Sequence, residues 1–354
     1  MNRYLLLVFG VLLTLAPFAS AQEVEWKDPS PHAVKFVTVE EGVQLEVLDW
    51  GGSGQTLVLL AGLGDTAHVY DDFAVPLIAR YHVLAITRRA FGRSSAPATG
   101  YGYARLGEDV MRVVDALGID KPIVIGHSFA GEEMHELGAR YPEKIAALVY
   151  VDAAFNRGDD SDNEAYNAAA QGLPNLPGPG TRDMASFTTL RSYLERTQGA
   201  AGPEGHLRAK FLTNPDGSIR GQWTPDLPIR QEYTKEMRAA YNPYNPAPIR
   251  VPALAIYAVP KSVEDFMRRG STSRVRFPED FIDSTTKDPA LRARVEKLFQ
   301  LERARFEGHA NWFRQFARQA RVMEVSGPHY IFLTNAADVV RQIDDFVALL
   351  AVSR

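Results

Sequence analysis

A short apolar run that ends in a tight turn of small residues constrains this chain more than any other feature. Residues 122–131 read PIVIGHSFAG, and the first four have the apolar, β-branched composition typical of a buried strand. Residues 132–141 follow with a helical pattern. We therefore predict a strand, a sharp turn and a helix, with Ser128 at the corner in a strained backbone conformation and its hydroxyl outside the sheet.

The small residues around Ser128 have a steric purpose. Side chains larger than those of Gly126 and Ala130 would collide with neighbouring backbone in so tight a turn. The helix that begins after the turn directs its positive dipole end toward Ser128, which favours negative charge developing there.

Apolar strand-like runs alternate with helical patterns along most of the chain. Strands are expected at residues 33–40, 43–50, 56–60, 81–87, 122–125, 146–151, 251–259 and 321–325, and helices at 67–80, 105–117, 132–141, 289–317 and 338–350. The first two strands flank Glu41-Gly42 and predict an antiparallel hairpin. The regular alternation that follows predicts an α/β fold, with a mostly parallel sheet and helices on both faces.

The turn at Ser128 resembles the nucleophile elbow of the α/β-hydrolase family. The family motif is G-x-S-x-G, and residues 126–130 read GHSFA, with Ala130 in place of the last glycine. Residues 88–95 are similar to the family's R-G-x-G-x-S loop, with Ala90 at its first glycine. We assign that loop no chemistry. The order of these motifs along the chain is the order found in the family.

The loop after the third predicted strand is a second family position. Residues 61–65 read AGLGD, with Ala61 where the family usually has histidine. An oxyanion hole needs only backbone N–H groups, so this substitution leaves the chemistry possible. The resemblance implies that the N–H groups of Leu63 and Phe129 form that hole.

A nucleophilic serine needs a base within hydrogen-bond reach, and histidine suits this role because its pKa lies near neutrality. The family places its catalytic histidine after the last strand, where residues 326–332 read SGPHYIF. The resemblance therefore implies Ser128 and His329 as nucleophile and base. His127 adjoins Ser128, but adjacent side chains diverge on a tight turn, so we expect it not to be the base.

The acid that orients the histidine has three candidates. Asp152 ends the strand at residues 146–151, where some family members carry this acid, and we favour it for its place at the end of a well-defined strand. The commoner position follows the strand at residues 251–259, where this chain has Lys261, so Asp265 and Glu264 remain alternatives. Asp152 could also serve only to cap the following turn.

Residues 156–248 interrupt the alternating pattern. They are polar and rich in glycine and proline, with helical pieces near 187–196 and 230–241. Their aromatic residues argue against a disordered linker; these are Phe211, Trp223, Tyr233, Tyr241 and Tyr244. The resemblance implies a mainly helical cap here, inserted between a first core part at residues 22–155 and a second at 249–354.

The N-terminus has the three parts of a secretory signal peptide. Asn2-Arg3 is positively charged, residues 4–16 are almost wholly apolar, and Ala19-Ser20-Ala21 is a small-residue cleavage site. The apolar run is shorter than the roughly 20 residues that span a bilayer. We therefore expect cleavage near Ala21, no stable membrane anchor, and a periplasmic or secreted protein.

The amino-acid composition limits the binding partners and the chemistry that we expect. The chain has 354 residues, a formal net charge of −4 and no cysteine, which excludes disulfides and thiolate chemistry. The sequence contains no stripe of basic residues, so we do not expect it to bind nucleic acid. We expect neither a cofactor nor a metal. We expect a serine hydrolase that cleaves carboxylic esters of small molecules. Alternatives are cleavage of an amide, lactone or carbon–carbon bond, acyl transfer on the same fold, or binding without catalysis.

Overall fold

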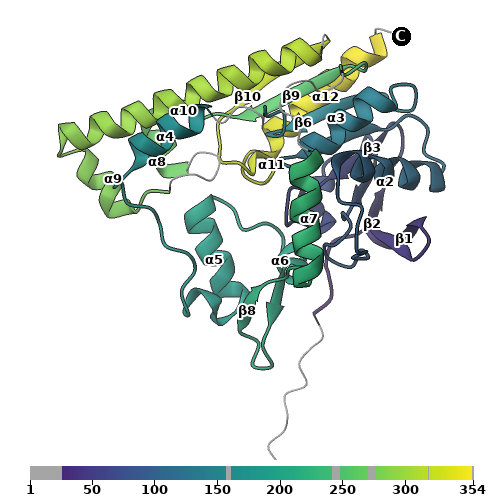
Figure 1. Ribbon diagram of the computed structural model, residues 1–354, viewed down its shortest axis with the longest axis horizontal. Helices are drawn as coiled ribbons and strands as arrows, with labels where there is room; N and C mark the ends of the chain where they lie inside the picture. The colour runs from purple at the N-terminus through teal and green to yellow at the C-terminus, as the bar shows by residue number, and fades with distance from the viewer. Residues whose placement is uncertain (1–25, 157–160, 241–247, 270–275, 318, 353–354) are drawn as a thin grey trace, which may run out of the picture.

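The chain forms a large mixed sheet covered by helices, and a further group of elements that includes α5, α6 and β8 lies apart from the sheet (Figure 1). The computed structural model describes residues 26–156, 161–240, 248–269, 276–317 and 319–352. The predicted signal peptide at residues 1–21 therefore lies outside the described residues.

Eight of the described strands pair in the order β1-β2-β4-β3-β5-β6-β9-β10. They are β1 (Ala33–Glu40), β2 (Val43–Gly51), β3 (Thr56–Leu60), β4 (His82–Ile86), β5 (Ile123–His127), β6 (Ala147–Val151), β9 (Ala253–Ala258) and β10 (Ala320–Val325). The β1–β2 and β2–β4 pairs are antiparallel, and from β4 to β10 every pair is parallel. The predicted hairpin and mostly parallel sheet are confirmed.

Helices cover both faces of this sheet, as predicted. One face packs against α2 (Tyr103–Ala116), α3 (Ala130–Arg140) and the C-terminal part of α10 (Pro289–Phe316). The other packs against η1 (Ala67–Tyr70), α1 (Asp71–Ala74), α11 (Ile331–Thr334) and α12 (Ala336–Val352). The central strands are apolar on both sides because both faces are buried, which is the usual pattern in parallel sheets.

The helix predicted over residues 67–80 is wrong in its second half. Only η1 and α1 are helical, and residues 75–80 form turns. Pro76 supplies the physical reason, since it has no N–H to donate to the preceding helical turn.

The segment between β6 and β9 contains more structure than its sequence indicated. It includes α4 (Ser161–Ala170), α5 (Phe187–Gln198), α6 (Glu204–Lys210), α7 (Leu227–Ala240) and a small antiparallel hairpin of β7 (Phe211–Thr213) and β8 (Ile219–Gln222). Tyr241 and Tyr244 lie outside the described residues. In Figure 1, α5, α6 and β8 lie together, apart from α4.

The helix α4 packs away from the rest of that segment. Its Tyr166 joins an apolar cluster with residues of α8 (Val263–Arg269), α9 (Glu279–Thr285) and the N-terminal part of α10. Figure 1 shows α4 and α8 beside α10 at the top of the view, with β8 well separated from them at the bottom. Two separate stretches of chain thus contribute helices beyond the sheet.

Among the described residues, no helix combines the length and apolarity that crossing a bilayer requires.

Candidate active site

Ser128 occupies a strained turn between β5 and α3. Its φ is +55°, in the left-handed region that non-glycine residues rarely adopt. The turn is closed by close packing: a Cβ added to Gly126 would lie 2.2 Å from Sδ of Met134 and 2.9 Å from Cβ of Ala130. A Cβ on Gly131 would lie 2.0 Å from the carbonyl oxygen of Ala153. Small residues are therefore required at this turn, but the collision at Gly126 is with side chains and not with the backbone that the sequence led us to expect; only Gly131 faces backbone.

Three side chains from the carboxyl ends of β5, β6 and β10 form one hydrogen-bonded chain. Nε2 of His329 lies 2.8 Å from Oγ of Ser128, and Nδ1 of His329 lies 2.5 Å from Oδ2 of Asp152. The Asp152 carboxylate is fully buried, and its Oδ1 accepts the backbone N–H of Ala258 at 3.0 Å. This arrangement fixes which ring nitrogen of His329 faces Ser128.

The alternative acids lie elsewhere. Asp265 accepts hydrogen bonds from the hydroxyl of Ser326 at 2.5 Å and from the N–H of Lys261 at 3.0 Å. Glu264 is on the exposed surface of α8 and forms a 2.6 Å ion pair with Arg292. Of the three candidates, the structure brings Asp152 to His329.

His127 contacts the loop that carries His329. Its Nε2 donates to the backbone carbonyl of His329 at 3.0 Å, and its ring packs against the rings of His329 and Tyr330. Burial lowers the pKa of His127 to about 3, and the neighbouring His329 ring acts in the same direction. His127 is therefore neutral at physiological pH and positions the backbone of the 326–332 loop.

The loop after β3 runs directly beside the elbow. A Cβ added to Gly62 would lie 3.3 Å from Cβ of Ser128 and 3.0 Å from Nδ1 of His127. This places Leu63, whose side chain is exposed, one residue from the contact with the elbow. Phe129 follows Ser128 at the first turn of α3 and is buried. The two residues predicted to supply the oxyanion donors thus follow Gly62 and Ser128 directly in the chain, and Gly62 and Ser128 lie close together.

Arg88 holds this loop in place, although we assigned no chemistry to residues 88–95 from the sequence. Its guanidinium donates to the carbonyl of Ala61 at 2.8 Å and to that of Gly62 at 3.3 Å. The same group is hydrogen-bonded to Glu133 of α3 and lies 4.8 Å from the centre of the Phe129 ring. One buried cation therefore contacts both segments that carry the predicted oxyanion donors. Arg88 and Glu133 are far apart in the sequence, so the sequence alone does not reveal that they pair.

Asp65, at the end of the same loop, joins the core to the inserted segment. Its carboxylate accepts from Nζ of Lys210 at 2.5 Å and from the hydroxyl of Tyr330 at 3.0 Å, and Nε2 of His206 lies 3.4 Å away. Burial alone would raise the pKa of Asp65, but Lys210 and His206 hold it well below its usual range. Asp65 is therefore charged at neutral pH and anchors α6 beside the candidate site.

A cavity of about 120 Å³ lies between this anchor and the inserted helices. Tyr330, next to His329, forms one wall, and the inserted segment supplies most of the rest. Its polar lining includes Lys210, His206 and Gln222, and its apolar lining includes Leu194 and Phe211. Trp223 and Tyr233 do not line it; they pack against Phe91, and Tyr233 also packs against Tyr101.

The fold and the elbow define the class of this chain. A family model described as alpha/beta hydrolase fold matches residues 55–227. The crystal structure of E-2-(acetamidomethylene)succinate hydrolase superposes with a TM-score of 0.57 at 16% identity, covering 90% of this chain and 99% of that one, and so shares its fold. The chain belongs to the α/β-hydrolase family.

Relatives of known sequence match only parts of the chain. Bifunctional epoxide hydrolase 2 of Mus musculus is 30% identical over 132 residues, which are 36% of this chain and 24% of that protein. The 2-(acetamidomethylene)succinate hydrolase of Mesorhizobium japonicum is 26% identical over 199 residues, 48% of this chain and 72% of that protein. Alignments with four curated relatives span between 24% and 43% of those proteins' lengths.

Proposed function

We propose that this protein is a serine hydrolase that cleaves carboxylic esters of small molecules through Ser128, His329 and Asp152. The observation that carries the proposal is the hydrogen-bonded chain from Oγ of Ser128 through the His329 ring to the buried Asp152 carboxylate, at 2.8 and 2.5 Å. Nucleophile, base and orienting acid are each within hydrogen-bond reach of the next, which is the geometry that serine activation requires.

The proposed reaction has two halves. Ser128 attacks the ester carbonyl while Nε2 of His329 takes its proton, and the N–H groups of Leu63 and Phe129 stabilise the oxyanion. The intermediate collapses to an acyl-enzyme as His329 returns the proton to the leaving alcohol. Water, activated by the same ring, then releases the acid. Asp152 stabilises the imidazolium in both halves.

We assign substrate selection to residues 156–248, as a cap over the site. The contact of Lys210 with Asp65 and the cavity bounded by Tyr330 support this assignment. Residues of α5, α6, β7 and β8 line that cavity together with Tyr330, which adjoins His329 in the chain.

A different scissile bond is the second candidate. The relative from Mesorhizobium japonicum is named as a hydrolase of 2-(acetamidomethylene)succinate, whose acetamido group makes an amide a reasonable alternative substrate class. An epoxide hydrolase would use aspartate as the nucleophile, whereas this chain has Ser128.

We also propose that the chain is exported and loses residues 1–21. The three-part N-terminus supports this. Intact-mass measurement of protein from the periplasm or medium should give an N-terminus near Gln22. Recovery of the uncleaved chain from the cytoplasm would contradict export.

The experiment that tests the catalytic proposal is a comparison of wild type with Ser128→Ala. The mature protein is assayed on p-nitrophenyl esters of increasing acyl length and on the matching anilides, and is labelled with a fluorophosphonate. Wild type should take one label and hydrolyse short esters, and Ser128→Ala should lose labelling and about 10⁶-fold in kcat. Labelling without turnover of either series would point to another bond. Ester turnover retained in folded Ser128→Ala would overturn the triad.

A further inference from the structure

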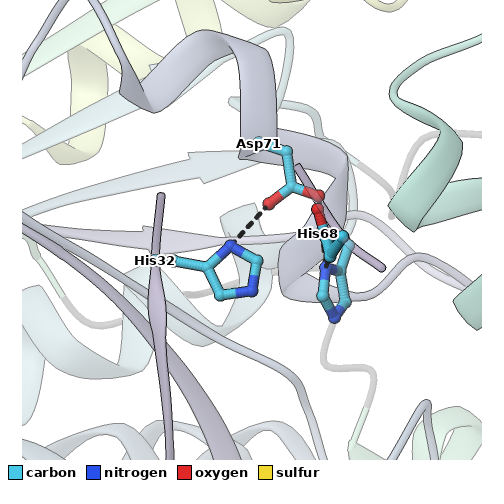
Figure 2. Close-up of side chains that lie close together, drawn as sticks. His32, His68 and Asp71 are labelled. Atoms are coloured by element: carbon cyan, nitrogen blue, oxygen red, sulfur yellow. Dashed lines mark hydrogen bonds and ion pairs between the residues drawn. The ribbon is translucent and has the colours of Figure 1, made fainter. Parts of the chain in front are cut away.

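Four metal-ligating side chains converge at a place remote in sequence from the predicted triad. Asp28 and His32 come from the segment before β1, His68 lies in η1, and Asp71 is the first residue of α1. One ligand atom from each lies within 4.8 Å of all the others. Figure 2 shows His32 and His68 on either side of the Asp71 carboxylate. From the sequence we expected no metal, because no metal-ligand cluster is visible there.

Three of the separations between these atoms are close to those in a single small coordination sphere, although the full set extends to 4.8 Å. Nδ1 of His68 lies 3.1 Å from Oδ2 of Asp28 and 3.1 Å from Oδ2 of Asp71, and Nδ1 of His32 lies 3.2 Å from Oδ1 of Asp71. With metal–ligand bonds of about 2.0 Å, neighbouring ligand atoms in a tetrahedral zinc site are about 3.3 Å apart. Little movement would be needed to bring one ion to all four residues.

Several of the atoms that face one another are buried without a hydrogen bond of acceptable geometry. They include Nδ1 of His32, Oδ1 of Asp71 and Oδ2 of Asp28. The side chains of His32 and Asp71 are each only 3% exposed. Their only close polar neighbours among the described residues are atoms of the same four side chains, at 3.1–3.2 Å. Buried polar atoms are normally hydrogen-bonded, so ligand atoms gathered in this way favour a bound ion.

Neighbouring groups hold the ligands in orientation. Asp28 accepts the N–H of Ser30 on its Oδ1 at 2.9 Å, which directs its Oδ2 toward the cluster. The Trp50 ring packs edge-on against His32, with ring centres 5.3 Å apart. A Cβ on Gly205 would lie 2.6 Å from Oδ2 of Asp28 and 2.7 Å from Oδ2 of Asp71, so glycine leaves space above both carboxylates. Such outer contacts are typical of metal sites.

We propose that Asp28, His32, His68 and Asp71 bind one divalent transition-metal ion, with zinc the best match. Two imidazole nitrogens and two carboxylate oxygens form a borderline donor set that suits zinc, and two carboxylates neutralise a divalent charge. Calcium and magnesium prefer sites made entirely of oxygen. The ion would join the segment before β1 to the η1–α1 corner, which follows the loop at residues 61–65.

The four side chains can also be described as ion pairs without a metal, and the experiment must distinguish that state from a metal site. Nδ1 of His68 lies 3.1 Å from a carboxylate oxygen of Asp28 and of Asp71, and Nδ1 of His32 lies 3.2 Å from the other oxygen of Asp71, so ion pairs alone hold the four side chains together when no ion is bound. A metal ion binds only neutral imidazole and ionised carboxylates, so its affinity should weaken as pH falls.

The test is metal binding by the untagged mature protein after chelator treatment. Calorimetric titration with Zn²⁺ should show one ion per chain, and Co²⁺ should give the visible absorption of a four-coordinate site. Zn²⁺ at 100 times its Kd should raise the Tm by about 4 °C, since it binds the folded state only. His32→Ala and Asp71→Asn should each weaken binding about 100-fold or more, beyond the loss expected for outer contacts.

His82→Ala is the matched control. His82 forms a 3.0 Å pair with Asp49 nearer the surface, so its removal should leave Zn²⁺ affinity unchanged. If a ligand variant fails to fold by circular dichroism, Gly205→Ala provides a second test. This change removes no ligand but should lower affinity by crowding both carboxylates. Absence of stoichiometric Zn²⁺ binding, or equal affinity in His32→Ala and wild type, would overturn the proposal. Neither result depends on hydrolase activity.

Discussion

Oδ2 of Asp152 lies 2.5 Å from Nδ1 of His329, while Oδ1 of the same carboxylate accepts the backbone N–H of Ala258. The carboxylate is thus held by β9 on one side and oriented toward the His329 ring on the other. Asp152 itself has a φ of +45°, directly after β6. A strained, buried acid with both oxygens engaged is expected where structure is organised around a reactive group.

This relationship gives a sharp prediction for Asp152→Asn. The asparagine oxygen can still accept from Ala258, so the fold should be retained. Its amide NH₂ would then face Nδ1 of His329 and favour the tautomer with a proton on Nε2, which cannot accept the Ser128 proton. We expect kcat to fall by about 10⁴-fold, as for the equivalent change in the serine-protease template. Steady-state kinetics on one p-nitrophenyl ester measures this.

Glu264→Gln and Asp265→Asn are the controls for that prediction. Glu264 pairs with Arg292 on the surface, and Asp265 contacts Ser326 and Lys261 rather than His329. Both changes should leave kcat within a few-fold of wild type. A large loss in either, with a mild effect of Asp152→Asn, would transfer the orienting role to the segment after β9.

The parts of this site predictable from sequence are those with local signals. A strand, a turn of small residues and a helix place Ser128 without knowledge of any contact, since Gly126 and Gly131 are required sterically within the same motif. His329 and Asp152 each follow a recognisable apolar strand. The carboxyl ends of adjacent parallel strands meet at one edge, so residues there converge.

Arg88 shows what local signals cannot reveal. Its partners Ala61, Gly62 and Glu133 come from two other segments, and only the folded sheet brings them together. The same is true of Asp65 with Lys210, and of the cluster around His68. Pairings of this kind depend on the relative placement of elements, which periodicity and spacing do not encode.

The second prediction concerns Arg88, whose effects on stability and on catalysis can be measured separately. Arg88→Met leaves Glu133 buried without its cation, which should cost roughly 3–5 kcal/mol of unfolding free energy. It also removes the donors that hold Ala61 and Gly62 beside the elbow. The double change Arg88→Met with Glu133→Leu should recover most of the stability, because a buried ion pair is often replaceable by apolar groups.

The two readouts distinguish a positioning role from a structural one. In the folded double variant we expect kcat to remain about 10-fold or more below wild type, because misplacing one oxyanion donor weakens transition-state stabilisation. Urea unfolding and ester kinetics measure the two quantities. Wild-type kcat in the double variant would show that the loop keeps its place without Arg88.

His127 predicts a pH dependence of stability. Its pKa is about 3 in the folded protein, below the ordinary value of 6.5. Between these values the unfolded chain binds a proton that the folded protein does not, so the free energy of unfolding falls as pH decreases from about 6.5. The loss from this one group should be on the order of 3 kcal/mol by pH 4.

His127→Gln tests this because glutamine keeps a donor for the His329 carbonyl but does not titrate. Urea unfolding at pH 7, 6, 5 and 4 should give a shallower decline for the variant than for wild type. His206, whose pKa burial also lowers, contributes equally to both proteins. An equal decline in the free energy of unfolding for the two proteins would show that the pKa of His127 is the same in the folded and unfolded states.

The last prediction concerns how the cap is held on the core. The carboxylate of Glu236, on α7, accepts the backbone N–H groups of Gly100, Tyr101 and Gly102 at 2.6–3.2 Å. These groups lead into the N-terminus of α2, where a negative charge is favourable. Glu236→Ala removes a charged acceptor from three donors at once and should cost about 1–3 kcal/mol of local stability.

That loss should act on the docking of α7 more than on the whole fold, because α7 contributes no described residue to the two hydrophobic clusters that pack on the sheet. Since about 1.4 kcal/mol corresponds to a tenfold change in an equilibrium, limited proteolysis within residues 227–240 should accelerate about 10-fold, with a smaller shift in Tm. KM should rise more than kcat falls, since Glu236 contacts the segment before α2 and none of the three triad residues.

Glu232→Ala is the matched control on the same helix. Glu232 pairs only locally, with Lys235 at 3.0 Å, so its removal should leave cleavage and KM close to wild type. Equal cleavage rates in Glu236→Ala and Glu232→Ala would mean that the packing of Tyr233 against Phe91 and Tyr101 alone holds α7. In that case Tyr233→Ala, rather than Glu236→Ala, should release the helix.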